Sequence, residues 1–246
     1  MHQYRADLHI HTSASPCAMP EMLPVSIVDR AVTLGIDIIA VSDHNTAENV
    51  DNVFSEGQKA GITVLPSIEV TTTEGAHVLA LFETPQKARA LESIIHMRHK
   101  QRESARMGSG NFLSLIDQDS IFGAIKNNSY DYMWSGLTLN EVVEKTHQIG
   151  GIVIASHIDR SFMSVISELG EVPSALFFEA LEISAATPQT AALRKFSAYR
   201  SIPWVRSSDA HELNDIGRQT TIFRLNAPSF LEIARVLRER QPDIMP

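Results

Sequence analysis

The sequence predicts an α/β fold built around a mainly parallel sheet. Short apolar runs recur along the 246 residues, and patterns typical of amphipathic helices separate most of them. Several of these runs are almost entirely apolar, as is typical of strands that are buried on both faces. Seven such runs in one chain favour closure of the sheet into a barrel.

The predicted strands are short, and several of them lead directly into polar residues. They cover residues 6–11, 36–41, 62–70, 77–82, 151–155, 180–183 and 203–206. The turn residues between Glu69 and His77 indicate that the third and fourth strands form a hairpin. His77 would then lie near Glu69, although it begins its strand.

The predicted helices are bounded by residue types that are common at helix ends. They cover residues 24–34, 47–60, 138–149, 188–200 and 229–239. Gly35, Gly61 and Gly150 follow the first three, at the position where a helix often ends in a left-handed residue. Pro24 opens the first helix, and Ser229 is the predicted N-cap of the last.

Residues 85–136 interrupt this alternation. They have mixed charge, Gly-Ser punctuation and no strong strand signal. We predict that they are an insertion over the mouth of the barrel, acting as a lid. With 43% hydrophobic residues the chain can bury a sizeable core, so residues 1–246 are predicted to form one domain that includes this insertion.

Composition and charge restrict the class of protein. A net charge of −8 gives no general basic surface, so binding to long nucleic acid is not expected. The single cysteine allows no intrachain disulfide, which suits a reducing compartment. No signal peptide or membrane-spanning run is evident, and we therefore expect a cytoplasmic protein that binds no membrane.

The first predicted strand has an unusual polar face. Side chains alternate along a strand, so Asp7, His9 and His11 are predicted to point to one side, and Leu8 and Ile10 to the other. An isolated His-x-His pair on a strand is more often structural than a ligand pair, so the other strand ends must decide between the two interpretations.

Further groups of the same kind stand near the ends of other predicted strands. They are Asp43 and His44, Glu69, His77, His157, and Asp209 with His211. The carboxyl ends of parallel barrel strands meet at one face, where active sites are built, so we expect these residues to converge.

Imidazole and carboxylate together suit zinc, iron or manganese. The number of ligands exceeds what one ion needs, which implies at least two ions, with Glu69 placed to bridge them. Such a site generates hydroxide from bound water near neutral pH and stabilises a displacement at phosphorus. The sequence therefore predicts a hydrolytic metal centre.

The motifs DLHIH, SDHN, IEVTT followed by GAHVLAL, SHIDR and SDAH, in this order, resemble the PHP superfamily, named for polymerase and histidinol phosphatase. The resemblance is to its stand-alone phosphoesterases. It implies a distorted seven-stranded β/α barrel, a trinuclear metal centre and phosphoester hydrolysis. Carried over position by position, the implied ligands are His9, His11, His44, Glu69, His77, His157, Asp209 and His211.

One departure from the family pattern concerns a ninth ligand. Many members place an aspartate shortly after the first histidine pair, where this chain reads HTSASPCAMPEM. Glu21 is the nearest carboxylate, and we expect it to reach in from a longer loop. Cys17, a softer ligand, is the alternative.

Three other residues have predicted roles beside the ligands. Asp43 is a candidate for orienting ligand imidazoles by hydrogen bonds. Arg160 is placed to hold a substrate phosphate by a bidentate contact, and an ordinary surface ion pair is the competing interpretation. Arg218, which shortly follows the last motif, is a second candidate for the same role.

The expected function is hydrolysis of a small phosphorylated metabolite or nucleotide by a metal-bound hydroxide, releasing inorganic phosphate. Two or three divalent ions of zinc, manganese or iron are expected as cofactors, with magnesium as a further option. The alternatives are an exonuclease on short oligonucleotides and a non-catalytic metal-binding module. Amide hydrolysis is less favoured because no lysine stands at a predicted strand end.

Overall fold

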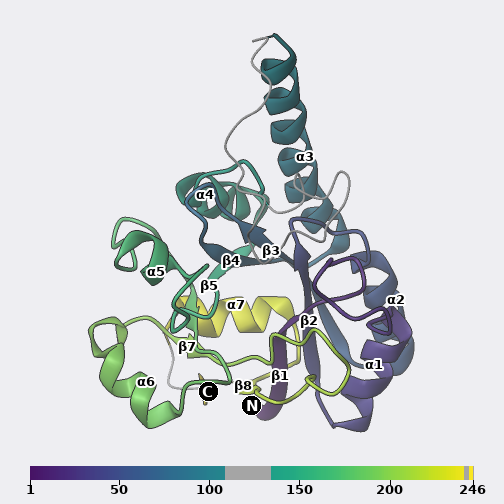
Figure 1. Cartoon of the computed structure of the whole chain (residues 1–246). Coiled ribbons are helices and arrows are strands. Elements are labelled where there is room, and N and C mark those ends of the chain that lie inside the picture. The colour runs from purple at the N-terminus through teal and green to yellow at the C-terminus, as the bar shows by residue number, and fades with distance from the viewer. Residues whose placement is uncertain (109–133, 241–243, 246) are drawn as a thin grey trace.

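The computed structural model describes residues 1–108, 134–240 and 244–245, and these form an α/β barrel (Figure 1). Their sheet has nine strands in the order β7-β6-β5-β4-β3-β2-β1-β8-β9. The strands are β1 (His2–Ile10), β2 (Ile38–His44), β3 (Thr63–Thr71), β4 (His77–Leu81), β5 (Ile152–Ala155), β6 (Ala180–Glu182), β7 (Trp204–Val205), β8 (Thr221–Leu225) and β9 (Ile244–Met245). The outer strands β7 and β9 contact one another, so the sheet is nearly closed. The predicted barrel is confirmed.

Strand direction is parallel except at two places. β1, β2 and β3 are parallel to one another, as are β5, β6 and β7. β4 is antiparallel to both of its neighbours, which confirms the predicted hairpin. β8 pairs antiparallel with β1, and β9 with β8. Seven predicted strands therefore correspond to seven observed ones, and β8 and β9 are additional.

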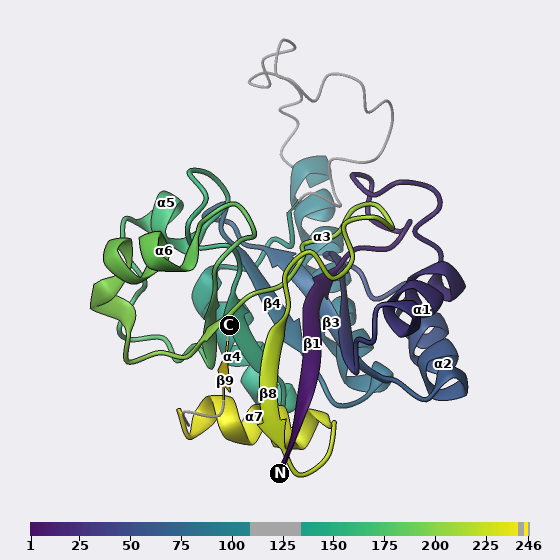
Figure 2. The same ribbon diagram turned by 90° about the horizontal axis from the view of Figure 1, so that it is seen from below.

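Helices cover the outside of the barrel and one of its ends. They are α1 (Pro24–Thr33), α2 (Val50–Ala60), α3 (Pro85–Gly108), α4 (Leu139–Ile149), α5 (Val165–Leu169), α6 (Gln189–Lys195), the 3-10 turn η2 (Ser197–Tyr199) and α7 (Phe230–Arg238). Apolar side chains of α1 and α2 pack on the outer face of β1 and β2, and those of α3 and α4 on β3, β4 and β5. Figure 2 shows α7 lying across the end of the barrel from which β1 starts.

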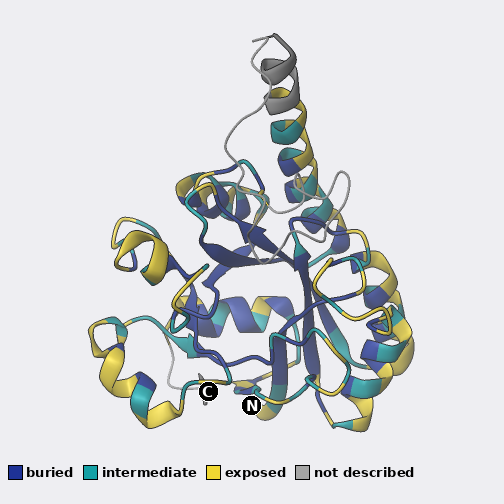
Figure 3. Cartoon of the chain, viewed as in Figure 1, coloured by how far each residue is buried: buried dark blue, intermediate teal, exposed yellow. Residues whose placement is uncertain are grey.

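The barrel interior is filled by apolar side chains up to the level of the predicted ligands. Alternate residues of β1 to β8 form one buried cluster with α7, as in Leu8, Leu65 and Ile154 packed with Ile233 and Leu237. Figure 3 shows the buried strands enclosed by helices whose outer faces are exposed. The filled interior leaves the opposite end, at the carboxyl ends of the parallel strands, for a functional site.

A bulge in β1 changes the predicted facing of its side chains. Ala6 and Leu8 both point into the barrel interior, whereas Ile10 packs outside with α1 and α2. The pairing of β1 with β2 shifts register between Asp7 and Ile10, as a β-bulge requires. His9 and His11 therefore share the inner face, and the prediction that Asp7 shares it was wrong.

The predicted insertion begins too early at residue 85. α3 starts at Pro85, and its Ala88, Leu91 and Ile95 are buried in the cluster on the outer face of β3 to β5. This part of α3 belongs to the helical layer of the barrel. Of the predicted lid, residues 109–133 lie outside the described residues.

Two predicted helices differ in extent. α2 begins at Val50 rather than at residue 47, because Thr46 and Ala47 are hydrogen-bonded to Glu92 in a turn. The helix predicted over residues 188–200 ends at Lys195 and continues as the turn η2. A search of the described residues finds no helix with the length and apolarity needed to cross a bilayer.

Candidate metal centre

Eight predicted ligands converge at the end of the barrel opposite α7, and we call this set the metal centre. It comprises His9, His11, His44, Glu69, His77, His157, Asp209 and His211. They come from β1, β2, β3 and β4 and from the loops that follow β5 and β7. His9 and His11 are fully buried, and Glu69 and His157 are 1% exposed. The strand polarity described above explains this convergence, since the start of antiparallel β4 meets the end of β3.

The imidazoles of β1 have fixed tautomers. His9 Nδ1 lies 3.0 Å from Glu182 Oε2 and donates its proton to that carboxylate. Ser15 Oγ donates to Asp43 at 2.6 Å, so it accepts from His11 Nδ1 at 3.0 Å. Both Nε2 atoms therefore present lone pairs to the interior of the centre.

These lone pairs face one another and a carboxylate. His9 Nε2 and His11 Nε2 are 3.2 Å apart, and each is 3.3 Å from Asp209 Oδ1. Three acceptors at this separation repel one another unless positive charge lies among them. In the ion-free protein, bound protons supply this charge. Burial lowers the pKa of His11, but hydrogen bonds to Asp209 and Glu69 outweigh this effect and raise that pKa to about 9.

Glu69 lies at the middle of the centre. Its Oε1 is 3.1 Å from His77 Nδ1 and 3.2 Å from His157 Nε2, and its Oε2 is 3.2 Å from His44 Nδ1. Burial alone would raise the pKa of Glu69, but the neighbouring imidazoles of His77 and His9 hold it well below its usual range. An ionised carboxylate with imidazoles on both oxygens is arranged as a bridging ligand.

Two ligand residues adopt backbone conformations that are rare outside glycine. The φ angle is 28° at His157 and 51° at Asp209. Hydrogen bonds hold these turns: Glu182 accepts from His157 N at 3.0 Å, and Asp7 accepts from Ser208 N and Gly217 N at 2.9 Å each. Strain of this kind persists where surrounding contacts over-determine it, and is concentrated at functional sites.

The residues present fit divalent ions. Ligand atoms lie within 4.8 Å of one another in three groups: His9, His11 and Asp209; His44, Glu69 and His77; and Cys17 with His11, His44 and His211. Within the described part of the chain, His157 Nδ1 is buried without a hydrogen-bond partner, and His44 Nδ1 has no aligned one although Glu69 Oε2 lies 3.2 Å away. Buried acceptors and unpartnered imidazole nitrogens are the donor set expected of a zinc, iron or manganese site.

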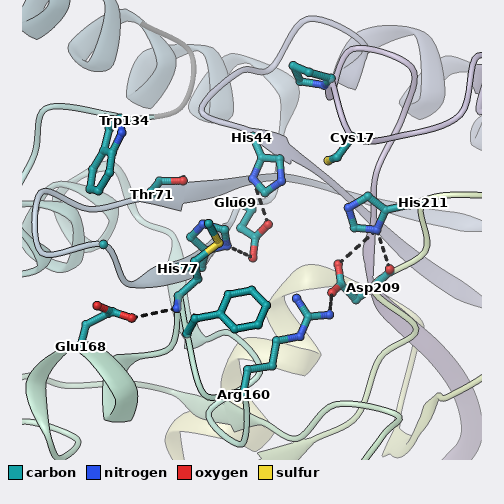
Figure 4. A pocket seen from close by; sticks show the side chains of 14 residues that line it. Cys17, His44, Glu69, Thr71, His77, Trp134, Arg160, Glu168, Asp209 and His211 are labelled. Atoms are coloured by element: carbon teal, nitrogen blue, oxygen red, sulfur yellow. Dashed lines mark hydrogen bonds and ion pairs between the residues drawn. The ribbon is translucent and has the colours of Figure 1, made fainter. Parts of the chain in front are cut away.

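The two candidates for a ninth ligand lie in different places. Glu21 is exposed and belongs to none of the three groups, so the structure does not bring it to the centre. Cys17 is exposed at the rim, but its sulfur points into the centre (Figure 4). Loss of solvent around that thiol and the nearby charge of Glu69 raise the pKa of Cys17 to about 12.

The two arginines predicted to bind phosphate lie in different surroundings. Arg160 is paired with Asp209 and faces the cavity beside the centre. Arg218 is 61% exposed, pairs with Asp215 and does not line that cavity. Only Arg160 is therefore placed to contact a molecule bound at the centre.

The cavity at the centre has a volume of about 450 Å³. One side is formed by His44, Glu69, His77, Asp209 and His211. Trp134, Phe162 and Met163 provide apolar surface on the other side, and Trp134 and Phe162 are 42% and 58% exposed. The opening is thus polar at the ligands and aromatic at its edge.

Glu182 is a functional residue that the sequence analysis missed. It ends β6, is 1% exposed, and contacts both His9 Nδ1 and the backbone of His157. Period-two alternation from the inward Ala180 would have placed it on the inner face. Asp43 accepts from Ser15, which contacts the imidazole of His11, whereas Asp7 holds a loop from outside the barrel.

Comparison with known proteins agrees with this arrangement. The family model of the PHP domain matches residues 7–179, and a PHP-associated model matches residues 192–242. A 5'-3' exoribonuclease of Haemophilus influenzae is 29% identical over 101 residues, which are 39% of this chain and 36% of that protein.

Two solved structures share the fold. A lesion-specific endonuclease from Pyrococcus furiosus has a TM-score of 0.69 and 20% identity, covering 99% of this chain and 58% of its own. A presumed metal-dependent phosphoesterase from Bifidobacterium adolescentis has a TM-score of 0.61 and 17% identity, covering 97% and 96%. With the family model matching most of its length, this chain belongs to the PHP domain family.

Proposed function

We propose that this chain is a metal-dependent phosphoesterase that hydrolyses a small phosphorylated metabolite or nucleotide and releases inorganic phosphate. The observation that carries the proposal is the set of facing acceptors at His9, His11 and Asp209, with Glu69 among the other imidazoles. Two or three divalent ions, when bound there, supply the Lewis acidity that activates water and neutralises charge on phosphoryl oxygens.

The chain's own residues fix how such a site is held and approached. Glu182 and the Ser15–Asp43 pair keep the imidazoles of β1 in the ligand tautomer. Arg160, which faces the cavity from the loop after β5, is positioned to donate to oxygens of an anionic substrate. The cavity volume of about 450 Å³ suits a molecule of nucleotide size.

An exonuclease acting on short oligonucleotides is the second candidate. Trp134 and Phe162 are exposed at the cavity edge, where aromatic rings can stack on unpaired bases. The relative from Haemophilus influenzae is named as an exoribonuclease, and the Pyrococcus furiosus structure as an endonuclease. The expectation against long nucleic acid depended on net charge alone, and these relatives weaken it.

A substrate panel tests both candidates. Elemental analysis of the purified protein should find two or three equivalents of metal, and metal-dependent hydrolysis should then be measured on phosphomonoesters, mononucleotides and end-labelled oligonucleotides. His9→Ala and Glu69→Gln should each reduce turnover at least about a hundredfold while far-ultraviolet circular dichroism stays unchanged. His96→Ala, at an exposed histidine of α3, is the matched control and should retain turnover.

Each outcome of the substrate panel distinguishes between the two candidate functions. Release from mononucleotides or phosphomonoesters supports the phosphoesterase, and shortening of oligonucleotides alone supports the exonuclease. Full activity in Glu69→Gln would overturn the role proposed for Glu69. Bound metal without hydrolysis of any substrate would overturn the proposed function in favour of a non-catalytic module.

A further inference from the structure

The third group of ligand atoms contains a thiol. Cys17 Sγ and one ring nitrogen each of His11, His44 and His211 all lie within 4.8 Å of one another. Ligands of one tetrahedral ion at about 2.0–2.3 Å lie about 3.3–3.8 Å from one another. Side-chain shifts of about 1 Å would therefore bring these donors around one ion. Figure 4 shows the sulfur directed into the cavity between His44 and His211.

The imidazoles of this group have nitrogen lone pairs available. His211 Nδ1 donates to the carbonyl oxygen of Asp209 at 2.9 Å, which leaves Nε2 without a proton. His11 donates from Nδ1 to Ser15, with the same result. These two rings stack with centroids 4.2 Å apart, so the two imidazoles lie side by side.

An independent observation points to a bound ion. His44 Nδ1 is buried, and it has no aligned hydrogen-bond partner among the described residues although Glu69 Oε2 lies 3.2 Å away. A buried imidazole nitrogen without a hydrogen bond is costly unless something else satisfies it. A cation bound to His44, either beside Glu69 and His77 or beside the thiol, would do so.

The loop that carries Cys17 is anchored to the residues it would join. Met19 N donates to the carbonyl oxygen of His211 at 2.8 Å, and Ser13 N donates to that of Met22 at 2.9 Å. Ala18 N donates to Ser15, whose side chain contacts both Asp43 and His11. The position of the thiol is therefore set by backbone contacts within the centre itself.

We propose that Cys17 is a thiolate ligand, which with His44 and His211 holds one of the divalent ions of the proposed phosphoesterase. On binding, the S–H bond breaks, a sulfur–metal bond forms, and the proton passes to solvent. This inference rests on one part of the proposed function, namely that the centre binds metal ions. Glu21, the carboxylate expected at this place, lies exposed outside the group.

The thiolate has a consequence for metal choice. Sulfur is a soft donor, and a site of imidazoles with one thiolate favours zinc, cobalt or iron over manganese and magnesium. The other two groups contain only imidazole and carboxylate donors, which accept manganese readily. The centre should therefore bind ions of different preference at different positions.

Cobalt titration tests the proposal without measuring activity. Cys17 is the single cysteine of the chain, so any thiolate-to-cobalt charge-transfer band in the near ultraviolet comes from this residue. The metal-stripped protein should develop that band with cobalt, and elemental analysis should give one equivalent of zinc more than in Cys17→Ala. Cys17→Ser should lose the band, and Cys17→Asp should bind manganese at the restored position more tightly than Cys17→Ala.

Glu21→Gln is the matched control, and it should keep both the band and the metal content. Metal binding with no band in the unchanged protein, or loss of one equivalent in Glu21→Gln instead of Cys17→Ala, would overturn the thiolate ligand while leaving the phosphoesterase intact. A protein that binds no metal at all would overturn both proposals.

Discussion

Three imidazoles at the centre, those of His9, His11 and His211, direct their Nδ1 protons away from it. The acceptors are a carboxylate, a serine hydroxyl and a backbone carbonyl. Each acceptor decides which ring nitrogen presents a lone pair, and so decides whether the ring can bind metal. Ligand identity at these positions depends as much on Glu182 and Ser15 as on the histidines.

Replacing the carboxylate behind His9 tests this dependence. Glu182→Gln removes the charge that holds the His9 proton on Nδ1, so metal affinity should fall about 10–100-fold. Competition with a chromogenic chelator measures this change directly.

The same strand offers a matched control. Glu179, immediately before β6, is equally buried and contacts His147, Val153 N and Arg238 at the other end of the barrel. Glu179→Gln should lower the free energy of unfolding by about 1–3 kcal/mol and leave metal affinity unchanged. Equal losses of metal affinity in both variants would show that Glu182 acts only through stability.

The sequence was sufficient to predict that the eight candidate ligands converge, because each lies at or near a strand end whose direction decides its position. It was insufficient for Glu182, because that residue stands in a short, mostly apolar run. It was also insufficient for Asp7, because the bulge in β1 shifts the alternation by one residue. A bulge depends on pairing with β2, and this pairing is not visible in β1 alone.

At the scale of elements, α7 and the metal centre occupy opposite ends of one filled barrel. Phe230, Ile233 and Leu237 of α7 complete the interior cluster formed by alternate strand residues. The helix therefore contributes stability to the barrel without contacting the ligands.

Truncation on the inner face of α7 should separate stability from metal binding. Leu237 is fully buried, so Leu237→Ala should lower the free energy of unfolding by about 2–5 kcal/mol. Leu231→Ala, at a residue of the same helix that is 63% exposed, should change it by less than about 0.5 kcal/mol. Denaturant unfolding measures both, and reduced metal content in folded Leu237→Ala would contradict the separation.

Helices and strands with a clear hydrophobic periodicity were predicted from the sequence, and those with a weaker periodicity were not. β8 has the alternating burial of a strand with one inner face, but TIFRL is short and contains a charged residue. The core residues of α3 follow helical spacing, yet the mixed charge of the segment concealed them. In both cases tertiary packing decides what the local composition leaves ambiguous.

For the whole molecule, the proposed metal binding should be coupled to folding. Without ions the centre holds facing acceptors and buried charge, so chelation should lower the melting temperature, and zinc or manganese should restore it. Saturation at about 100 times the dissociation constant contributes about 2.7 kcal/mol per site.

The sign of the pH dependence follows from His11. Its pKa of about 9 in the ion-free protein means that ion binding must displace a proton, so stabilisation by metal should be larger at about pH 8.5 than at about pH 6.5. Scanning calorimetry of stripped and loaded protein at both pH values measures this difference, and the reverse order would contradict the assignment.

The reversed direction of β4 has a consequence for how this barrel can vary. Because β4 runs away from the metal centre, α3 starts at the far end and returns along the barrel toward the end that holds the cavity (Figures 1 and 2). The aromatic residues that line this cavity, Trp134 and Phe162, lie outside the strands. Substitutions there can therefore alter which molecules reach the ligands while the order of the strands is inherited unchanged.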